Sequence, residues 1–441
     1  MESYFNYTIV EFSVETSAGF IDLTQSVAAL TYSEDITSPV TYVTAMIVNT
    51  GGILSKLKLR GGEKVRVILE QKATGGKFTL DENNNTYYIY NIANSTTEST
   101  KETFILEMVP REVLTNETTR CFRRYDTDLK QTVEKILKDE LKTTRYKSSN
   151  IEKTVNKYSF MANARKPFTV LGWVCPKGIP QIERGKSGEG VGTAGFLFFE
   201  NQEGYNFKSV DSLFDRNRRA KETYFYKEIV TSPADPQVNF KITAPPVFNK
   251  NVNILDNLRV GMYGSVNYFF DTNTRKFYGE SKPYLLSKNY NLMNLSGNET
   301  LDLPSIIIDK PSRLMVKMLD NGQMNKAGKL ETPDKRIEYQ GQGVSRYNLL
   351  FSQSLNITVP LNLRLTVGDV INVEFGQITK EDEKKGLRDN RKSGKYVISK
   401  LKHGFSDNKG LTGLELVRDS YGATKWFSKI LKITYKKTNQ N

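Results

Sequence analysis

The chain has 441 residues, of which 38% are hydrophobic and 11% aromatic. This length predicts about two to four domains, and the apolar content argues against wholesale disorder. The longest purely apolar run, at Phe196–Phe199, is far shorter than the roughly 20 residues of a membrane-spanning helix. The start, Met1–Tyr4, lacks the pattern of a secretory signal. We therefore expect no stable membrane insertion.

The net charge of +14 is unevenly distributed. Residues 1–112 carry nine basic and fourteen acidic side chains, a net charge of −5, whereas 113–214, 215–336 and 337–441 carry +5, +6 and +8. A basic surface is typical of proteins that meet nucleic acid or acidic partners. Solvated lysines on domain surfaces explain the same charge, and this simpler interpretation is favoured.

Metal and disulfide chemistry have few candidate residues. Cys121 and Cys175 are the two cysteines and His403 is the one histidine. Two cysteines do not make a disulfide framework, so a reducing compartment fits. A zinc site would have to recruit all three residues from distant positions, so we expect no metal and no cofactor.

Residues 1–112 predict β-strands. Tyr42–Val48 and Lys64–Glu70 alternate apolar with polar residues, and Tyr87–Ile92 and Phe104–Val109 are rich in β-branched and aromatic residues. Glycine and asparagine turn signals separate these runs, which is typical of a sandwich or barrel.

The middle of the chain predicts a mixed α/β domain. One apolar stripe has the period of a helix, with Asp126–Asp128 as its N-cap candidates: Leu129, Val133, Ile136, Leu137 and Leu141. Pro167 opens a second short helix through Trp173. A glycine-rich loop, Gly185–Gly195, then precedes an apolar strand at Phe196–Phe199.

The second half returns to strands. Residues 222–248 are strand-like but interrupted by prolines, and 250–336 are polar and turn-rich with one helix expected at Asn253–Tyr263. Residues 337–420 predict strands again, with Lys380–Lys395 as a charged, exposed connection. The tail after Gly422 is basic with interspersed apolar residues.

An internal repeat links the two strand-rich regions. Residues 57–70 read LKLRGGEKVRVILE and residues 363–376 read LRLTVGDVINVEFG, which aligns Gly62 with Gly368 and Glu63 with Asp369. Further on, Tyr88 aligns with Tyr396, and the run LEMV at 106–109 aligns with LELV at 414–417. Two matching blocks in the same order favour duplication of one β unit over a chance similarity of turns.

Catalytic motifs fail on their context. The run at 190–195 satisfies G-x-G-x-x-G, but a predicted strand follows it where a dinucleotide site needs a helix. Gly185–Ser187 resembles the end of a phosphate-binding loop, but Pro180 stands where that motif needs glycine. Basic-aromatic clusters at 120–124, 216–219 and 429–437 suit phosphate contact, although solvated faces or subunit contacts are commoner.

Three segments of the chain resemble a known family. They are 30–63, including TYSEDI at 31–36; 194–211, with AGFLFFEN followed by GYNFKSVD; and 368–422, ending in VRDSYG. The chain resembles the baseplate central hub proteins of T-even-type contractile-tailed bacteriophages, especially their marine relatives. The resemblance implies a structural role for the positions that match the family motifs. These positions are Glu34, Asp35, Gly62, Gly195, Phe198, Gly204, Phe207, Asp211, Gly368, Asp369 and Gly394.

The resemblance implies a homotrimeric ring with two related barrels in each subunit. Such a ring would join a six-fold tail tube, or tube-initiator proteins, to a three-fold central spike protein, and DNA would pass through its channel without sequence-specific binding. The expected location is the virion, in the tail baseplate, after assembly in the host cytoplasm. Gly61 has no counterpart, because Val367 stands in the second copy, so the two barrels should present similar but unequal surfaces.

Together these features predict a mainly β fold with α+β parts. The expected domains are a first β-barrel at 1–112, a mixed α/β domain at 113–221, a second, repeat-related barrel at 222–249 and 337–422, an inserted small domain at 250–336, and a basic tail at 423–441. A structural, non-enzymatic role is favoured. The alternatives are a tail-associated cell-wall hydrolase, since 49 acids allow carboxylate pairs, and a basic nucleic-acid-binding module.

Overall fold

The structure is a computed structural model. It describes residues 3–420 except 18, 51, 53–56, 82, 84, 99, 182–194, 227–235, 251–252, 273–274, 280–282, 289, 291–294, 296–300, 302, 320–335, 351–352, 377–388, 390 and 407–408. Most of the glycine-rich loop therefore lies outside the described residues. This part includes the Gly185–Ser187 motif and the G-x-G-x-x-G run up to residue 194. The tail 423–441 also lies outside the described residues.

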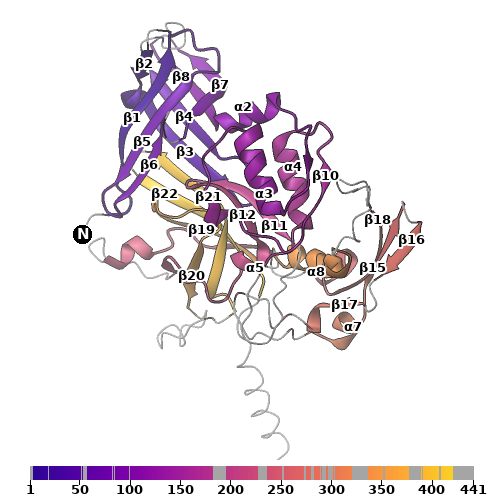
Figure 1. The fold of residues 1–441 in the computed structure, drawn as a ribbon. Helices are drawn as coiled ribbons and strands as arrows, with labels where there is room; N and C mark the ends of the chain where they lie inside the picture. The colour runs from indigo at the N-terminus through magenta and orange to yellow at the C-terminus, as the bar shows by residue number, and fades with distance from the viewer. Residues whose placement is uncertain are drawn as a thin grey trace, which may run out of the picture.

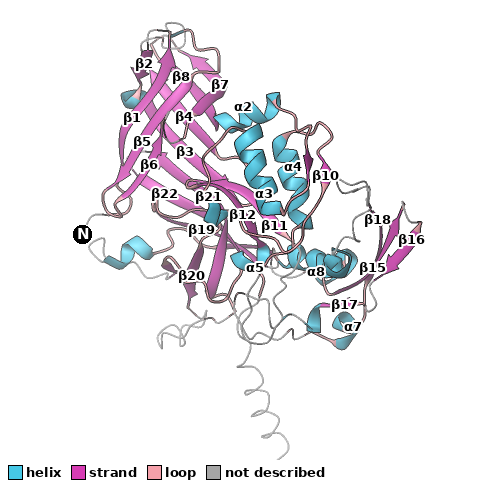
Figure 2. Cartoon of the chain, viewed as in Figure 1, coloured by secondary structure: helices cyan, strands magenta, loops and turns pink. Residues whose placement is uncertain are grey.

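The fold is mainly β with α+β parts, as predicted, and fourteen strands of the described chain form one continuous sheet (Figures 1 and 2). Strands from the first part are β1 (Thr8–Thr16), β2 (Gly19–Asp22), β3 (Val27–Asp35), β4 (Tyr42–Asn49), β5 (Lys64–Gln71), β6 (Gly76–Leu80), β7 (Tyr87–Thr97) and β8 (Glu102–Pro110), with a 3₁₀ turn η1 at Thr24–Ser26. Strands from the second part are β13 (Thr223–Tyr226), β14 (Val247–Lys250), β19 (Gln353–Pro360), β20 (Val370–Phe375), β21 (Gly394–Ser406) and β22 (Lys409–Arg418), with a 3₁₀ turn η5 at Pro236–Phe240.

The strand order is β14-β19-β22-β21-β3-β4-β8-β7-β5-β1-β2, with β6 beside β5, β20 beside β21 and β13 beside β20. Alternation of side chains explains why these segments are strands with one buried face. In β5, for example, Val65, Val67 and Leu69 are buried while the residues between them are partly exposed. The buried residues of both parts form one hydrophobic cluster.

The internal repeat corresponds to five strands in the same order. The order β3-β4-β8-β7-β5 in the first part matches β14-β19-β22-β21-β20 in the second. In each copy the glycine has a positive φ, 93° for Gly62 and 86° for Gly368, and its N–H donates to a strand carbonyl: Gly62 to Ile89 (2.7 Å) and Gly368 to Ile398 (2.9 Å). Glycine takes this left-handed conformation without steric cost, which explains its place in both turns.

The structure shifts one part of the sequence alignment by a residue. Tyr87, and not Tyr88, is the counterpart of Tyr396, because Val65 pairs with Tyr87 as Ile371 pairs with Tyr396. Tyr87 and Tyr396 are both fully buried. Both copies then carry a register shift at the same place, Ile89/Asn91 in one and Ile398/Lys400 in the other. A bulge conserved in position supports the common origin of the two copies.

The second copy differs from the first by a large insertion between two neighbouring strands. In the first copy, β3 and β4 are joined by six residues, 36–41. In the second, the equivalent strands β14 and β19 are joined by residues 251–352. This insertion holds a separate sheet of β15 (Gly264–Asp271), β16 (Lys276–Gly279), β17 (Tyr284–Leu285) and β18 (Arg313–Leu319), with helices α6 (Ile254–Val260), α7 (Ser305–Ile308) and α8 (Arg336–Leu349) and a 3₁₀ turn η6 (Leu286–Lys288).

Between the two copies lies a mixed part, seen beside the large sheet in Figure 2. Its elements are α2 (Arg111–Thr118), β9 (Arg124–Tyr125), α3 (Leu129–Lys135), a π-helical turn η2 (Ile136–Glu140), β10 (Phe160–Met161), α4 (Pro167–Val174), the hairpin β11 (Phe196–Asn201) and β12 (Gly204–Ser209), and α5 (Val210–Leu213), with 3₁₀ turns η3 (Ser148–Asn150) and η4 (Cys175–Lys177). The predicted stripe from Leu129 to Leu141 is fully buried, and Asp128 caps α3 by accepting from the Gln131 N–H at 3.0 Å.

Two sequence predictions are wrong. Residues 336–349 form the helix α8, although 337–420 were expected to be strands; α8 contains Gly341 and Gly343 and little helix propensity, and its packing against β15 overrides that weakness. The boundary expected at 336 thus falls at the start of a helix that contacts the inserted sheet. The connection expected to run to Lys395 ends earlier, because β21 begins at Gly394.

The hairpin glycine Gly204 gives a test of this packing. Its φ is 116°, and a Cβ there would lie 2.2 Å from the Arg145 carbonyl oxygen, whereas a Cβ at Gly172 in α4 meets nothing within 4 Å. We expect Gly204→Ala to lower the free energy of unfolding by at least about 2 kcal/mol and Gly172→Ala to leave it unchanged or raise it by up to about 1 kcal/mol. Urea unfolding of both variants measures this, and equal stabilities would contradict the packing described.

Candidate functional site

The two repeated halves meet along one pair of strands, β3 and β21, which we call the seam. Residues 29–35 of β3 pair antiparallel with residues 400–406 of β21, from Asp35 opposite Lys400 to Ala29 opposite Ser406. The first residues of β21 instead pair with β20. Strand β21 therefore pairs with β20 of its own copy in its first residues and with β3 of the other copy in its later residues.

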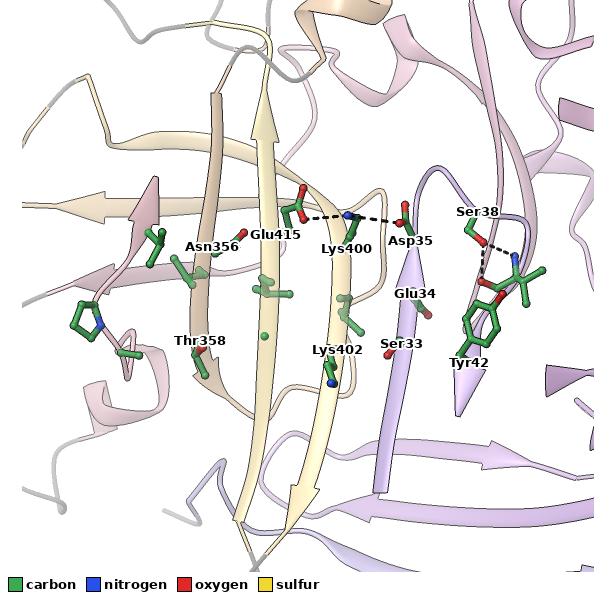
Figure 3. Close-up of a pocket in the computed structure, with 18 residues that line it drawn as sticks. Ser33, Glu34, Asp35, Ser38, Tyr42, Asn356, Thr358, Lys400, Lys402 and Glu415 are labelled. Atoms are coloured by element: carbon green, nitrogen blue, oxygen red, sulfur yellow. Dashed lines mark hydrogen bonds and ion pairs between the residues drawn. The ribbon is translucent and has the colours of Figure 1, made fainter. Parts of the chain in front are cut away.

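The polar face of the seam forms the floor of a groove of about 750 Å³ (Figure 3). Strands β19, β22, β21 and β3 cross this floor, and Ser38 and Tyr42 lie beyond β3 at one side. The groove is also lined by Val40, Ala244, Pro245 and Val247. Figure 3 shows Lys400 between Asp35 and Glu415, with its Nζ 3.9 Å from Asp35 Oδ2 and 3.3 Å from Glu415 Oε2. The Lys400 side chain is 53% exposed, so these ion pairs favour the observed register and add little stability.

The opposite face of the seam buries a carboxylate. Glu34 lies on β3 and is 3% exposed. Its Oε1 accepts from the Tyr32 hydroxyl at 2.7 Å and from the Gln202 N–H at 2.6 Å, and its Oε2 accepts from the Val367 N–H at 2.8 Å. Val367 precedes the glycine turn of the second copy, and Gln202 lies in the β11–β12 hairpin. One side chain thus ties together the first copy, the second copy and the mixed part.

Burial raises the pKa of Glu34 to about 7, against its three hydrogen bonds, which act to lower it. The usual value for a glutamate is 4.5. The group therefore changes charge near neutral pH in the folded chain, at a point where the first copy, the second copy and the mixed part meet.

Two further buried ion clusters join the mixed part to its neighbours. Glu200 of β11 pairs with Arg145 and accepts from the Thr41 N–H and hydroxyl of the first copy, both at 3.0 Å. Arg346 of α8 donates to Asp211 at 3.0 Å and to Asp419 at 2.5 Å. Burial raises the pKa of Glu200 and of Asp419, and the neighbouring arginine lowers each. Buried charges of this kind are tolerated only when every partner is in place.

The structure brings some of the predicted positions together and leaves others apart. Glu34 meets the turn of Gly368 and Asp369; the Asp369 carboxylate accepts from the Thr366 N–H at 2.9 Å and binds Lys221 at 2.7 Å. Asp35 lies on the groove side of the same strand. Gly62 sits in the equivalent turn of the first copy, and Gly394, with a φ of 136°, opens β21.

The remaining predicted positions belong to the β11–β12 hairpin and α5. The Phe198 ring stacks on Tyr205 with centroids 5.6 Å apart, and the Phe207 ring stacks on Phe196 at 4.4 Å. Gly195 has a φ of 143° and faces the Tyr347 ring, and Gly204 approaches the Arg145 carbonyl. Asp211 holds Arg346. These residues lie in or beside the hairpin that brings Gln202 to Glu34 and Glu200 to Thr41.

The groove contains no evident catalytic pair among the described residues. Asp35 and Glu415 share Lys400, and His403 points away from them into the core, where its Nδ1 lies 2.9 Å from the Thr412 hydroxyl oxygen. Burial lowers the His403 pKa to about 3, so the imidazole is neutral near pH 7. Cys121 and Cys175 are free and buried. In the described ranges, no three His, Cys, Asp or Glu side chains cluster as a metal site requires, and no helix is long and apolar enough to cross a membrane.

Sequence reasoning missed Glu200, Arg145, Arg346 and Asp419 as members of buried clusters. The partners are far apart in the chain; Arg346 and Asp211 are separated by 135 positions. Charged residues at such positions carry no local pattern that distinguishes them from surface charges.

Comparison with known proteins places the fold. No family model matches the chain, and no curated protein matches its sequence. The structure is similar to the prophage MuSo2 43 kDa tail protein from Shewanella oneidensis, with a TM-score of 0.52 and 8% identity over 93% of this chain and 98% of that one. It is also similar to a tail protein from Neisseria meningitidis MC58, with a TM-score of 0.51 and 11% identity over 95% and 98%. The chain has the fold of these tail proteins.

The pKa of Glu34 predicts a pH-dependent stability. A carboxyl whose folded pKa lies above its unfolded value stabilises the fold at low pH, and this contribution is lost as the pH rises through the folded pKa. Relative to Glu34→Gln, which cannot titrate, the wild-type free energy of unfolding should fall by up to about 3 kcal/mol from pH 5 to pH 8. Denaturant unfolding at each pH measures it. Glu203→Gln, at a half-exposed position in the same hairpin turn, is the matched control, and a flat difference for Glu34→Gln would contradict the assignment.

Proposed function

We propose that this chain is a structural, non-enzymatic subunit of the baseplate hub of a contractile phage tail. It forms a homotrimeric ring of six barrels that joins a six-fold tail tube, or tube-initiator proteins, to a three-fold central spike protein. DNA passes through the channel of this ring without sequence-specific binding. The subunit is assembled in the host cytoplasm, needs no cofactor and ends in the virion. The domain division given above is part of this proposal, with the inserted unit extended to residue 352, because α8 lies between β14 and β19 and packs on β15 of the inserted sheet.

The observation that carries the proposal is the seam together with two edges that match it. The second half of β21 pairs with β3, but its counterpart, the second half of β7 at residues 91–97, has no strand on that side among the described residues. The counterpart of β3 is β14, which ends the large sheet. Among the described residues, no strand pairs with the outer edge of β14. Each subunit therefore offers one half of a second seam at each end.

The bulges fix the expected register of that second seam. Thr96 is the equivalent of Gly404, since Thr96 pairs with Thr103 as Gly404 pairs with Leu411. Val247 is the equivalent of Thr31, since Val247 pairs with Asn356 as Thr31 pairs with Thr44. Gly404 is opposite Thr31 in the seam, so Thr96 should lie opposite Val247 of a neighbouring subunit.

Pairing of β7 with β14 of the next copy is heterologous, because the two edges differ. Such contacts either form open filaments or close into a ring. If the rotation between neighbouring subunits equals the rotation between the two copies within a subunit, the pairing closes into a ring of six barrels. Such a ring contains three subunits. Val247 is 54% exposed, and pairing would cover both edges, which soluble proteins otherwise protect from association.

A cysteine pair tests the ring. In a chain carrying Thr96→Cys and Val247→Cys, a short bismaleimide should link subunits into dimers and trimers, with no species beyond three chains. Denaturing gel electrophoresis and native mass measurement report the result. Cys121 and Cys175 are buried and should add no background.

Each single cysteine variant, and Thr96→Cys combined with Val10→Cys on the exposed face of β1, serve as controls and should not give the trimer. A strict monomer at high concentration would overturn the proposed ring. Linked species that continue beyond three would show a filament instead and would equally overturn it.

A further inference from the structure

The two ends of the large sheet carry different kinds of structure. At one end lie the connection between β3 and β4 and the insertion between β14 and β19. The mixed part packs on the first of these, where Glu200 accepts from the Thr41 N–H at 3.0 Å. The insertion packs on the end of β22, where Arg346 of α8 donates to Asp419. Both of these units occur once in each chain.

The other end of the sheet carries the same hairpin twice. The order β21-β3-β4-β8-β7 contains four antiparallel steps. Strands β7 and β21 therefore run in the same direction, and the turns that follow them lie at the same end. In Figure 1 the β7–β8 end of the sheet is at the top, and the inserted sheet is at the lower right. The β1–β2 hairpin reaches the upper end in the first copy only, because the parallel strand β13 lies beside β20 in the second.

The two hairpins have the same length and register. In the first, the Glu98 N–H donates to the Lys101 carbonyl at 2.7 Å. In the second, Ser406 pairs with Lys409. Two residues close each turn, and the offset between the hairpins is the one that aligns the LEMV run with the LELV run. Lys101 and Lys409 are therefore equivalent positions, which we call the hairpin lysines.

The hairpin lysines are the same in both copies, although the exposed face of the repeat has otherwise changed. Both side chains are exposed. The next two outward positions along these strands differ between the copies, with Thr103 in place of Leu411 and Ile105 in place of Gly413. Drift at these neighbouring positions makes the shared lysine a feature that calls for a reason.

The third outward position is also shared, but it has a reason inside the chain. Glu107 accepts from the Asn91 side chain at 2.9 Å, and Glu415 binds Lys400 at 3.3 Å. Within the described ranges, by contrast, neither hairpin lysine makes an ion pair or a side-chain hydrogen bond. Their charges are thus available to another molecule.

Symmetry selects the kind of partner. A six-fold partner needs six equal contact points. In the proposed ring, three subunits place six hairpin lysines at one rim, half of them from each copy. The opposite end cannot do this, because its mixed part and its insertion each occur once per subunit. Exposed cations at equal spacing are complementary to carboxylates on the partner.

We propose that the β7–β8 and β21–β22 hairpins dock a six-fold ring protein whose carboxylates bind the hairpin lysines. This inference rests on the proposed function, since it needs the ring, and adds which end of the ring meets which partner. The end that carries the mixed part and the insertion then faces the three-fold partner.

Charge reversal at the hairpin lysines tests the proposal in the virus that encodes this chain. Particles are assembled in cells that supply the full chain only as the variant, and electron microscopy gives the fraction of baseplates that carry a tube. Lys101→Glu and Lys409→Glu should each lower this fraction by a similar factor. The double variant should lower it at least about tenfold, because carboxylates then face carboxylates.

Two controls separate charge from other effects. Lys101→Arg combined with Lys409→Arg keeps both charges and should leave the tube-bearing fraction at the wild-type level. Lys138→Glu reverses another exposed lysine, in the mixed part, and should also leave it unchanged. A tube-bearing fraction that is unchanged in the double glutamate variant would overturn the proposal. An effect of only one of the two single variants would overturn it as well, because the hairpins would not be equivalent.

The cysteine-linked trimer separates failure of this inference from failure of the ring. The double glutamate variant, made in the chain with Thr96→Cys and Val247→Cys, should still be linked into trimers. Loss of its trimer would assign the lysines to subunit contacts and overturn the docking proposal. Tube-bearing particles in normal number that retain less DNA would assign them to the DNA instead, which also overturns it. If the chain without glutamate substitutions gives no trimer, the ring itself is overturned.

Discussion

Strand β3 hydrogen-bonds to the second half of β21, and this pairing makes one sheet of two repeated halves. A slip of one residue would turn every side chain of the seam to its opposite face. Leu30 and Tyr32 on β3, and Leu401 and Phe405 on β21, are almost completely buried, so the slipped arrangement would expose them and bury lysines. The hydrophobic pattern thus fixes the register, and the register fixes how one half is placed on the other.

The buried charges make that placement cooperative. Glu34 and Glu200 lie in strands β3 and β11, and Asp419 directly follows β22. Each of the three receives hydrogen bonds from a segment distant in the sequence. A carboxylate taken out of water without its donors costs several kcal/mol. The favourable contacts therefore exist only when the two sheet halves, the mixed part and α8 are assembled together. Glu34 adds a dependence on pH, because the same burial raises its pKa to about 7, so that it loses its proton near neutral pH.

Strand alternation and the helical stripe were readable in the sequence because each reflects a local period, and the repeat was readable because a positive φ demands glycine at Gly62 and Gly368. The register of Tyr396 was not, since a bulge shifts strand pairing without a sequence mark. Helix α8 was missed because its glycines, which suit close packing on β15, reduce helix propensity. The partners of Glu34 include two backbone N–H groups, at Gln202 and Val367, and backbone donors leave no trace in the residue pattern. The glutamate itself was found only through the family resemblance.

The insertion at residues 251–352 gives the duplication a consequence that a perfect repeat would not have. Two equal barrels per subunit would make a ring whose six positions look alike. Here the connection between β14 and β19 carries a folded unit, whereas the equivalent connection between β3 and β4 has six residues. In the proposed trimer the barrels repeat six times but the inserted units only three. In that proposed trimer the sheets would supply a six-fold frame and the insertions would impose three-fold order on it, so that one chain would present both symmetries at once.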